Sequence, residues 1–100
     1  MIKQLKIGGY TYKIKPERSV NKWGTCDSDN KTITINPNST SEQKCTTILH
    51  EAIHAIASEN GLNEHLSDGG EEIMVRVLES SIVQLFKTNK TFAKEFIKSL

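Results

Sequence analysis

The feature that most constrains this chain is a change in its hydrophobic period near residue 40. Before it, apolar and polar residues alternate from Leu5 to Ile14 and again from Lys31 to Ile35, which is typical of strands. After it, apolar residues recur at helical spacing over about 42–60, about 71–87 and a short segment ending at Leu100. Strands followed by helices predict an α+β fold, with an antiparallel sheet of three or four strands followed by three helices.

Turn and cap residues mark where these elements begin and end. Gly8-Gly9 predicts a hairpin between the first two strands. Ser39 and Glu42 have the spacing of a capping box for the first helix, and Gly61 is placed to end it. The strand Thr32–Ile35 has alternating Thr and Ile, so we expect it to be half buried and to lie at the edge of the sheet.

Length and charge exclude several classes of protein. One hundred residues predict a single domain over residues 1–100. A net charge of +1 gives no basic field for nucleic acid, and no apolar run is long enough to span a membrane. The N-terminal residues lack a signal-peptide pattern, and Cys26 and Cys45 form no disulfide framework, so a cytoplasmic protein with free thiols is expected.

The segment His50-Glu51-Ala52-Ile53-His54 carries the clearest chemical signal. Two histidines four residues apart on a helix lie about one turn apart, so both imidazoles can reach one metal ion. Glu51 lies farther round the helix, where it can act as a general base on a metal-activated water. The competing interpretation is an ordinary helix face on which two surface histidines flank a glutamate.

A catalytic zinc site of this kind needs a third protein ligand. The continuation found in metzincins is excluded because Ala57 and Asn60 stand where it needs glycine and histidine. A carboxylate from another helix is the remaining option, and Glu71 and Glu72 open the second long helix. Their alternative role is to complement the dipole of that helix.

Other residues offer weaker ligands. His65 is a rival third ligand or an oxyanion-stabilising group, and Asp68 is a weaker candidate. Cys26 and Cys45 are interpreted as small apolar residues.

The charges are unevenly distributed along the chain. No Lys or Arg occurs between Lys44 and Arg76, whereas that stretch contains six carboxylates, namely Glu51, Glu59, Glu64, Asp68, Glu71 and Glu72. This is either a solvated acidic face or a region that balances its charge with a bound cation.

The order of these segments resembles a known family. Gly24-Thr25-Cys26-Asp27, the strand Lys31–Ile35, the helix segment Thr47–Ala55 and the run Val83–Asn89 are similar to those of minigluzincins and of short phage-encoded zinc peptidase-like proteins related to the ImmA/IrrE domain. The resemblance implies a zincin-like fold and a phage or prophage origin. It places the third zinc ligand on Glu72, with Glu71 as the alternative, and implies that the strand Thr32–Ile35 pairs with an extended peptide.

Two functional hypotheses follow. The first is a zinc-dependent metallopeptidase in which His50, His54 and Glu72 hold Zn²⁺ and Glu51 is the general base. The second is a binding or regulatory module on a peptidase scaffold, with a structural metal and no proteolysis.

Overall fold

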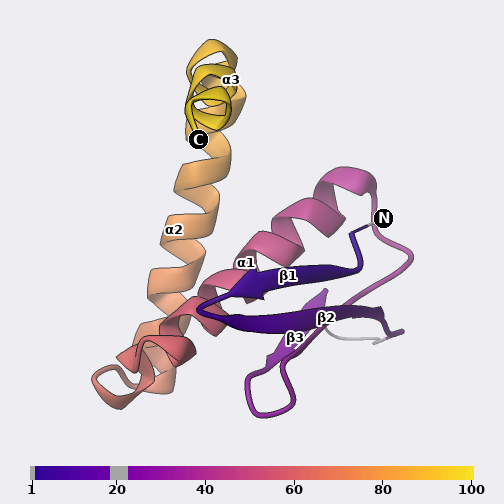
Figure 1. Ribbon diagram of the computed structural model, residues 1–100, viewed down its shortest axis with the longest axis vertical. Coiled ribbons are helices and arrows are strands. Elements are labelled where there is room, and N and C mark those ends of the chain that lie inside the picture. Colours follow the sequence, from indigo (N-terminus) through magenta and orange to yellow (C-terminus); the bar gives the residue numbers. More distant parts are fainter. Residues whose placement is uncertain (1, 19–22) are drawn as a thin grey trace.

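The computed structural model describes residues 2–18 and 23–100. A four-stranded sheet is followed by the helices that carry the candidate site (Figure 1). The elements are β1 (Gln4–Ile7), β2 (Tyr10–Pro16), β3 (Gly24–Asp27), β4 (Thr32–Ile35), α1 (Ser41–Glu59), the short 3₁₀ helix η1 (Leu62–Glu64), α2 (Asp68–Thr88) and α3 (Lys90–Ser99). The predicted α+β class, with the strands first and the helices after them, is confirmed.

The hairpin predicted at Gly8-Gly9 is present. β1 and β2 pair antiparallel, with Ile7 opposite Tyr10. Gly8 and Gly9 have φ angles of 58° and 88°, which is the left-handed region required by both central residues of a tight type I′ turn. The turn thereby fixes the register that places Tyr12 and Ile14 in the core.

The prediction that Thr32–Ile35 is an edge strand is wrong. The strand order is β1-β2-β4-β3, so β4 lies between two neighbours. It pairs antiparallel with β3 and parallel with β2, with Ile33 opposite Ile14. The sheet is therefore mixed rather than wholly antiparallel, and its edges are β1 and β3. Alternation of Thr and Ile showed that the strand has a buried face, but it carries no information about which strands flank it.

The N-cap of α1 lies one residue after the predicted cap, Ser39. Its N-cap is Thr40, whose side chain accepts a hydrogen bond from the backbone N–H of Gln43, while the Gln43 side chain accepts one from the Thr40 N–H. Ser39 instead donates its hydroxyl to the carbonyl of Asn36 at 2.7 Å. At the other end Gly61 has a φ of 73°, as expected of a residue that follows a helix.

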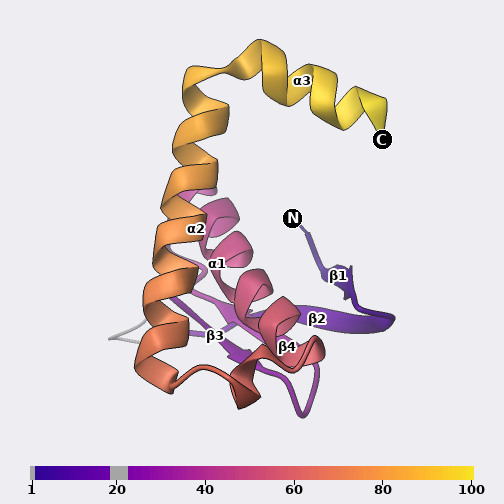
Figure 2. The same ribbon diagram turned by 90° about the vertical axis from the view of Figure 1, so that its left-hand side faces the viewer.

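α1 lies between the sheet and α2, and both sides of it are buried (Figure 2). Ile48, Ala52 and Ala55 join the core cluster formed by the sheet, and Ala55 is fully buried. Ile56 also belongs to the apolar residues at helical spacing in this segment, but it is 46% exposed. The small side chain of Ala55 permits the helix to approach the sheet closely. Because the side chain is small, Ala55 contributes little to the hydrophobic pattern from which a buried helix face is predicted.

α2 begins at Asp68, three residues before the predicted start at Glu71. The Ser67 hydroxyl accepts a hydrogen bond from the Gly70 N–H at 3.0 Å, so Gly69 and Gly70 form the first turn rather than a loop. Among the apolar residues of α2, Val75 is fully buried, whereas Leu85 is exposed. α3 then turns away from α2 (Figure 2).

Within the described ranges, no helix combines the length and hydrophobicity of a membrane span.

Candidate metal centre

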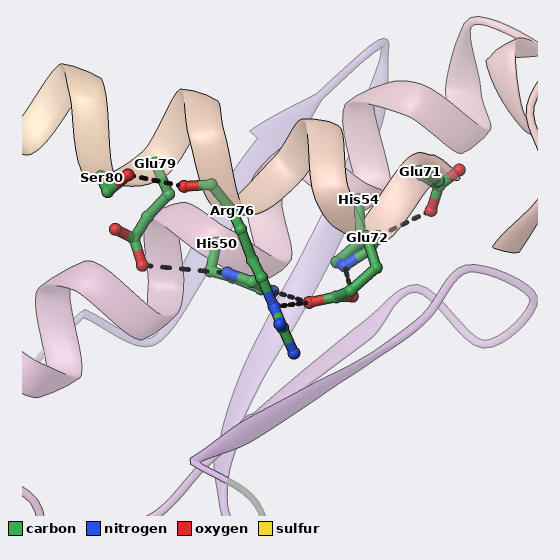
Figure 3. Close-up of polar contacts among 7 residues, drawn as sticks. All are labelled: His50, His54, Glu71, Glu72, Arg76, Glu79 and Ser80. Atoms are coloured by element: carbon green, nitrogen blue, oxygen red, sulfur yellow. Dashed lines mark hydrogen bonds and ion pairs between the residues drawn. The ribbon is translucent and has the colours of Figure 1, made fainter. Parts of the chain in front are cut away.

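The two histidines of the H-E-x-x-H segment lie side by side on α1 and face α2. One helical turn separates His50 from His54, and their ring centroids are 5.2 Å apart. Each side chain is about one-fifth exposed. In both rings the Nε2 atom is directed to the same residue of α2 (Figure 3).

That shared residue is Glu72. Its Oε1 lies 3.1 Å from His50 Nε2, and its Oε2 lies 2.9 Å from His54 Nε2. The single carboxylate therefore spans both imidazoles. Ligand atoms of His50, His54 and Glu72 all lie within 4.8 Å of one another.

The outer nitrogens of the two rings face other glutamates of α2. His54 Nδ1 lies 2.6 Å from Glu71 Oε2. His50 Nδ1 lies 3.8 Å from Glu79 Oε1, which is an ion-pair distance but too long for a hydrogen bond. Glu71 thus contacts one histidine from its outer side, whereas Glu72 contacts both from the inner side.

These contacts change the acidity of the groups involved. Burial lowers the pKa of His54, but the hydrogen bond with Glu71 and the negative charges of Glu51 and Glu72 outweigh it, so the pKa is raised above its ordinary value. Burial raises the pKa of Glu72, but the charge of His50 and the contacts with His54 and Arg76 leave it lowered. Both shifts favour the charged form of the group, the imidazolium of His54 and the carboxylate of Glu72.

Glu51 lies beside the histidines and is buried, with 8% of its surface exposed. It lines the same groove as His50 and His54. The neighbouring edge strand comes very close here, because a Cβ added at Gly24 would lie 3.5 Å from Glu51 Cγ and only 2.6 Å from both the Thr34 carbonyl oxygen and Thr47 Cγ2. Glycine at position 24 is what allows β3 to pack against this turn of α1.

The groove has a volume of about 1130 Å³ and runs between β3 with its turn and the two long helices. Six carboxylates line it, namely Asp27, Asp29, Glu51, Glu71, Glu72 and Glu79, whereas Arg76 is the one Lys or Arg side chain among the described residues that do so. The Arg76 Nε–H donates to Glu72 Oε1 at 3.2 Å. The surplus of negative charge favours a cation in this groove.

The donor set suits zinc. Two imidazole nitrogens and one carboxylate oxygen form a His₂Glu set, which leaves the fourth tetrahedral position open. Zinc–ligand bonds of about 2.0–2.2 Å separate tetrahedral ligand atoms by roughly 3.3 Å, close to the nitrogen–oxygen distances between Glu72 and the two rings. The residues present therefore fit the metal with small movements of side chains.

The other candidate ligands are not brought to this point. His65 and Asp68 are exposed and do not line the groove. Cys26 is half buried beside the core, in keeping with its interpretation as a small apolar residue, whereas Cys45 is exposed and departs from it. Of the six-carboxylate stretch, Glu51, Glu71 and Glu72 converge on the groove, whereas Glu59 pairs with Lys31.

Two residues near the site were placed beside Glu72 from the sequence but were given no role. Arg76 and Glu79 follow Glu72 by one and two turns of α2, so helical spacing alone places them on the side of Glu72. This i, i+4 and i+7 repeat places them on one side of α2, but only the structure shows that Arg76 contacts Glu72 and that Glu79 faces His50.

Two imidazoles one turn apart on α1 and a glutamate from α2, with the buried Glu51 beside them, form a group of residues that could hold a metal ion. Residues 8–77 match the model of the IrrE N-terminal-like domain, peptidase family M78. The chain belongs to this family, which agrees with the ImmA/IrrE resemblance of its sequence. Neither a comparison with curated proteins nor one with solved structures found a match.

Proposed function

We propose that this chain is a zinc metallopeptidase in which His50, His54 and Glu72 hold the metal and Glu51 is the general base. The observation that carries this proposal is the Glu72 carboxylate, which spans the Nε2 atoms of both histidines. Membership in a peptidase family supports the same reaction class. When bound, zinc supplies Lewis-acid chemistry, in that it polarises a carbonyl oxygen and lowers the pKa of water.

Glu51 supplies the proton transfer. Its carboxylate follows His50 in the chain and lines the same groove as both histidines. In the reaction, Glu51 takes a proton from the water that attacks the scissile carbonyl and then gives it to the amine that leaves. The partly closed surroundings of Glu51 limit competing contacts with bulk water.

The peptide is proposed to bind along β3 rather than along Thr32–Ile35. β3 is the sheet edge beside the groove, and Gly24, Thr25, Cys26 and Asp27 all line it. An extended peptide added to this edge would pair its backbone with β3 and pass in front of His50 and Glu51. The two free cysteines are consistent with a reducing compartment, and we propose a cytoplasmic location.

The test measures zinc content by mass spectrometry and cleavage of a mixed fluorogenic peptide library. Wild-type protein should bind one zinc and cleave. Glu51→Gln should keep the zinc and lose about 10²–10⁴-fold in activity, the usual contribution of a general base. Glu64→Gln, which removes an exposed carboxylate of η1, is the matched control and should behave as wild type. Retained cleavage by Glu51→Gln would reject the role given to Glu51.

A second candidate function is a binding or regulatory module with a structural metal. The observation that favours it is the apolar surface of α3 and the outer face of α2, where Ile73, Phe92 and Ile97 are at least half exposed. In that case the zinc-loaded protein would cleave no member of the library, and the only effect of removing zinc would be a lower free energy of unfolding.

A further inference from the structure

Three glutamates of α2 together face all four imidazole nitrogens of the candidate centre. Glu72 faces both Nε2 atoms, Glu71 faces Nδ1 of His54, and Glu79 faces Nδ1 of His50. Figure 3 shows these side chains directed to the two rings from one helix. α2 therefore provides the third ligand and, separately, contacts on the far side of each ring.

We propose that Glu71 is a positioning residue that fixes the ring of His54 so that its Nε2 is the atom offered to the metal. The Glu71 carboxylate lies 2.6 Å from Nδ1, the shortest of the contacts between these glutamates and the two rings. A carboxylate at this distance holds the proton on Nδ1 and leaves the lone pair on Nε2. A flip of the ring by 180° would break this hydrogen bond and place a carbon atom opposite Glu72.

A role in the helix dipole does not account for this geometry. Glu71 belongs to the first turn of α2, where a carboxylate complements the positive end of a helix. Its side chain is nevertheless only 18% exposed and is directed to His54, whose side chain is equally sheltered. The same helix end already has Asp68 in its first turn and the Ser67 cap.

Glu79 provides an internal comparison. It stands opposite His50 as Glu71 stands opposite His54, but at 3.8 Å the contact is too long for a hydrogen bond. Outer carboxylates that hydrogen-bond a ligand histidine usually contribute ten- to a hundredfold in metal affinity. We therefore expect Glu71→Gln to weaken zinc binding about 10–100-fold, and Glu79→Gln to weaken it by no more than about threefold.

The experiment measures zinc affinity by competition with a chromophoric chelator, for wild type and for Glu71→Gln, Glu71→Asp, Glu79→Gln and Glu64→Gln. Glu71→Asp keeps the charge but withdraws the carboxylate, so its affinity should fall between wild type and Glu71→Gln. Glu64→Gln, an exposed glutamate of η1, controls for the loss of one negative charge. Equal affinities of Glu71→Gln and wild type, or a larger loss in Glu79→Gln, would overturn the proposal.

Two further measurements separate positioning from ligation and from folding. Cobalt substitution should give the same tetrahedral absorption spectrum in wild type and Glu71→Gln, because the ligand set is unchanged; a changed coordination number would show that Glu71 is itself a ligand and would overturn the proposal. Long-range ¹H–¹⁵N spectra of the zinc-loaded protein should show a slowly exchanging His54 Nδ1 proton that exchanges faster in Glu71→Gln.

This inference rests on the metal site of the proposed function but not on catalysis. If wild type binds zinc and cleaves no peptide, the proposed peptidase activity fails, whereas the affinity ranking still tests Glu71. If wild type binds zinc and Glu71→Gln binds it equally well, positioning by Glu71 fails and the peptidase proposal is untouched. If wild type binds no zinc, both are rejected.

Discussion

The hydroxyl of Tyr12 donates a 2.8 Å hydrogen bond to Glu59, the last residue of α1. Tyr12 is fully buried in the middle of the sheet, so the bond ties the C-terminal end of the helix that carries both histidines to β2. The same carboxylate oxygen also receives the ammonium of Lys31 at 2.8 Å. Lys31 lies over the ring of Tyr10, at 4.2 Å from its centroid.

This contact predicts a loss of stability in acid. Hydrogen bonds from Lys31 and Tyr12 lower the pKa of Glu59 below its ordinary 4.5. Because the folded-state pKa is lowered, the stabilisation is complete above about pH 4.5 and is lost as the pH falls through the folded-state value. Glu59→Gln should therefore unfold at lower temperature than wild type at pH 7, with a difference that shrinks towards pH 3. Thermal melts across this range check it, and a difference independent of pH would contradict it.

Gly24→Ala should destabilise the protein. The added Cβ would lie 2.6 Å from the carbonyl oxygen of Thr34, a backbone atom of the paired strand that cannot move aside without disturbing β4. Overpacking of this kind costs about 1–3 kcal/mol. Gly69→Ala is the control of opposite sign, because nothing lies within 4 Å of its added Cβ and alanine favours a helix by roughly 0.5–1 kcal/mol. Urea denaturation measures both, and an unchanged midpoint for Gly24→Ala would refute the close approach.

The two thiols should differ in reactivity. Burial raises the pKa of Cys26 to about 11, whereas Cys45 is exposed on α1. Because the thiolate is the reactive form, native protein treated with iodoacetamide at pH 8 should be alkylated at Cys45 long before Cys26. Peptide mapping by mass spectrometry gives the order. Similar rates in the native protein would show that Cys26 is not sheltered, while equal rates in urea are the expected control.

Removal of zinc should lower the melting temperature. At free zinc about a thousandfold above the dissociation constant, binding stabilises the folded state by about 4 kcal/mol. For a chain of this length that corresponds to more than about 10 °C, since 1 kcal/mol shifts the midpoint by roughly 4–8 °C. A zinc chelator should abolish the shift, and His50→Ala should melt at the same temperature with and without zinc. A melting temperature of wild type that ignores both zinc and chelator would exclude a folded-state metal site.

Much of the site could be predicted from the sequence because its key spacing is local. His50, Glu51 and His54 share one helix, so their relative positions follow from the helical repeat. Glu71 and Glu72 were harder to separate, since neighbouring residues lie about 100° apart round a helix, and the histidine atoms that each one contacts depend on how the two helices pack. Glu72 contacts the Nε2 atoms of both rings, whereas Glu71 contacts only Nδ1 of His54.

The features that sequence reasoning missed depend on tertiary structure. Ser39 with Glu42 and Thr40 with Gln43 are two overlapping capping boxes, and only the hydrogen bond from Ser39 to Asn36 excludes the first. The place of β4 within the sheet depends on its pairing with β2, which lies far from it in the sequence.

The place of β4 between β2 and β3 also bears on how the chain folds. Each antiparallel hairpin closes between strands adjacent in the sequence and can form quickly, whereas the parallel seam that joins Ile14 to Ile33 has to await an encounter of the two hairpins. We expect this encounter to be the rate-limiting step, so that Ile33→Val slows refolding in stopped-flow experiments and leaves unfolding nearly unchanged. If Ile33→Val instead speeds unfolding and leaves refolding unchanged, the pairing of β2 with β4 forms after the transition state for folding. With either result, the pairing of β2 with β4, next to which α1 packs, is the last part of the sheet to form.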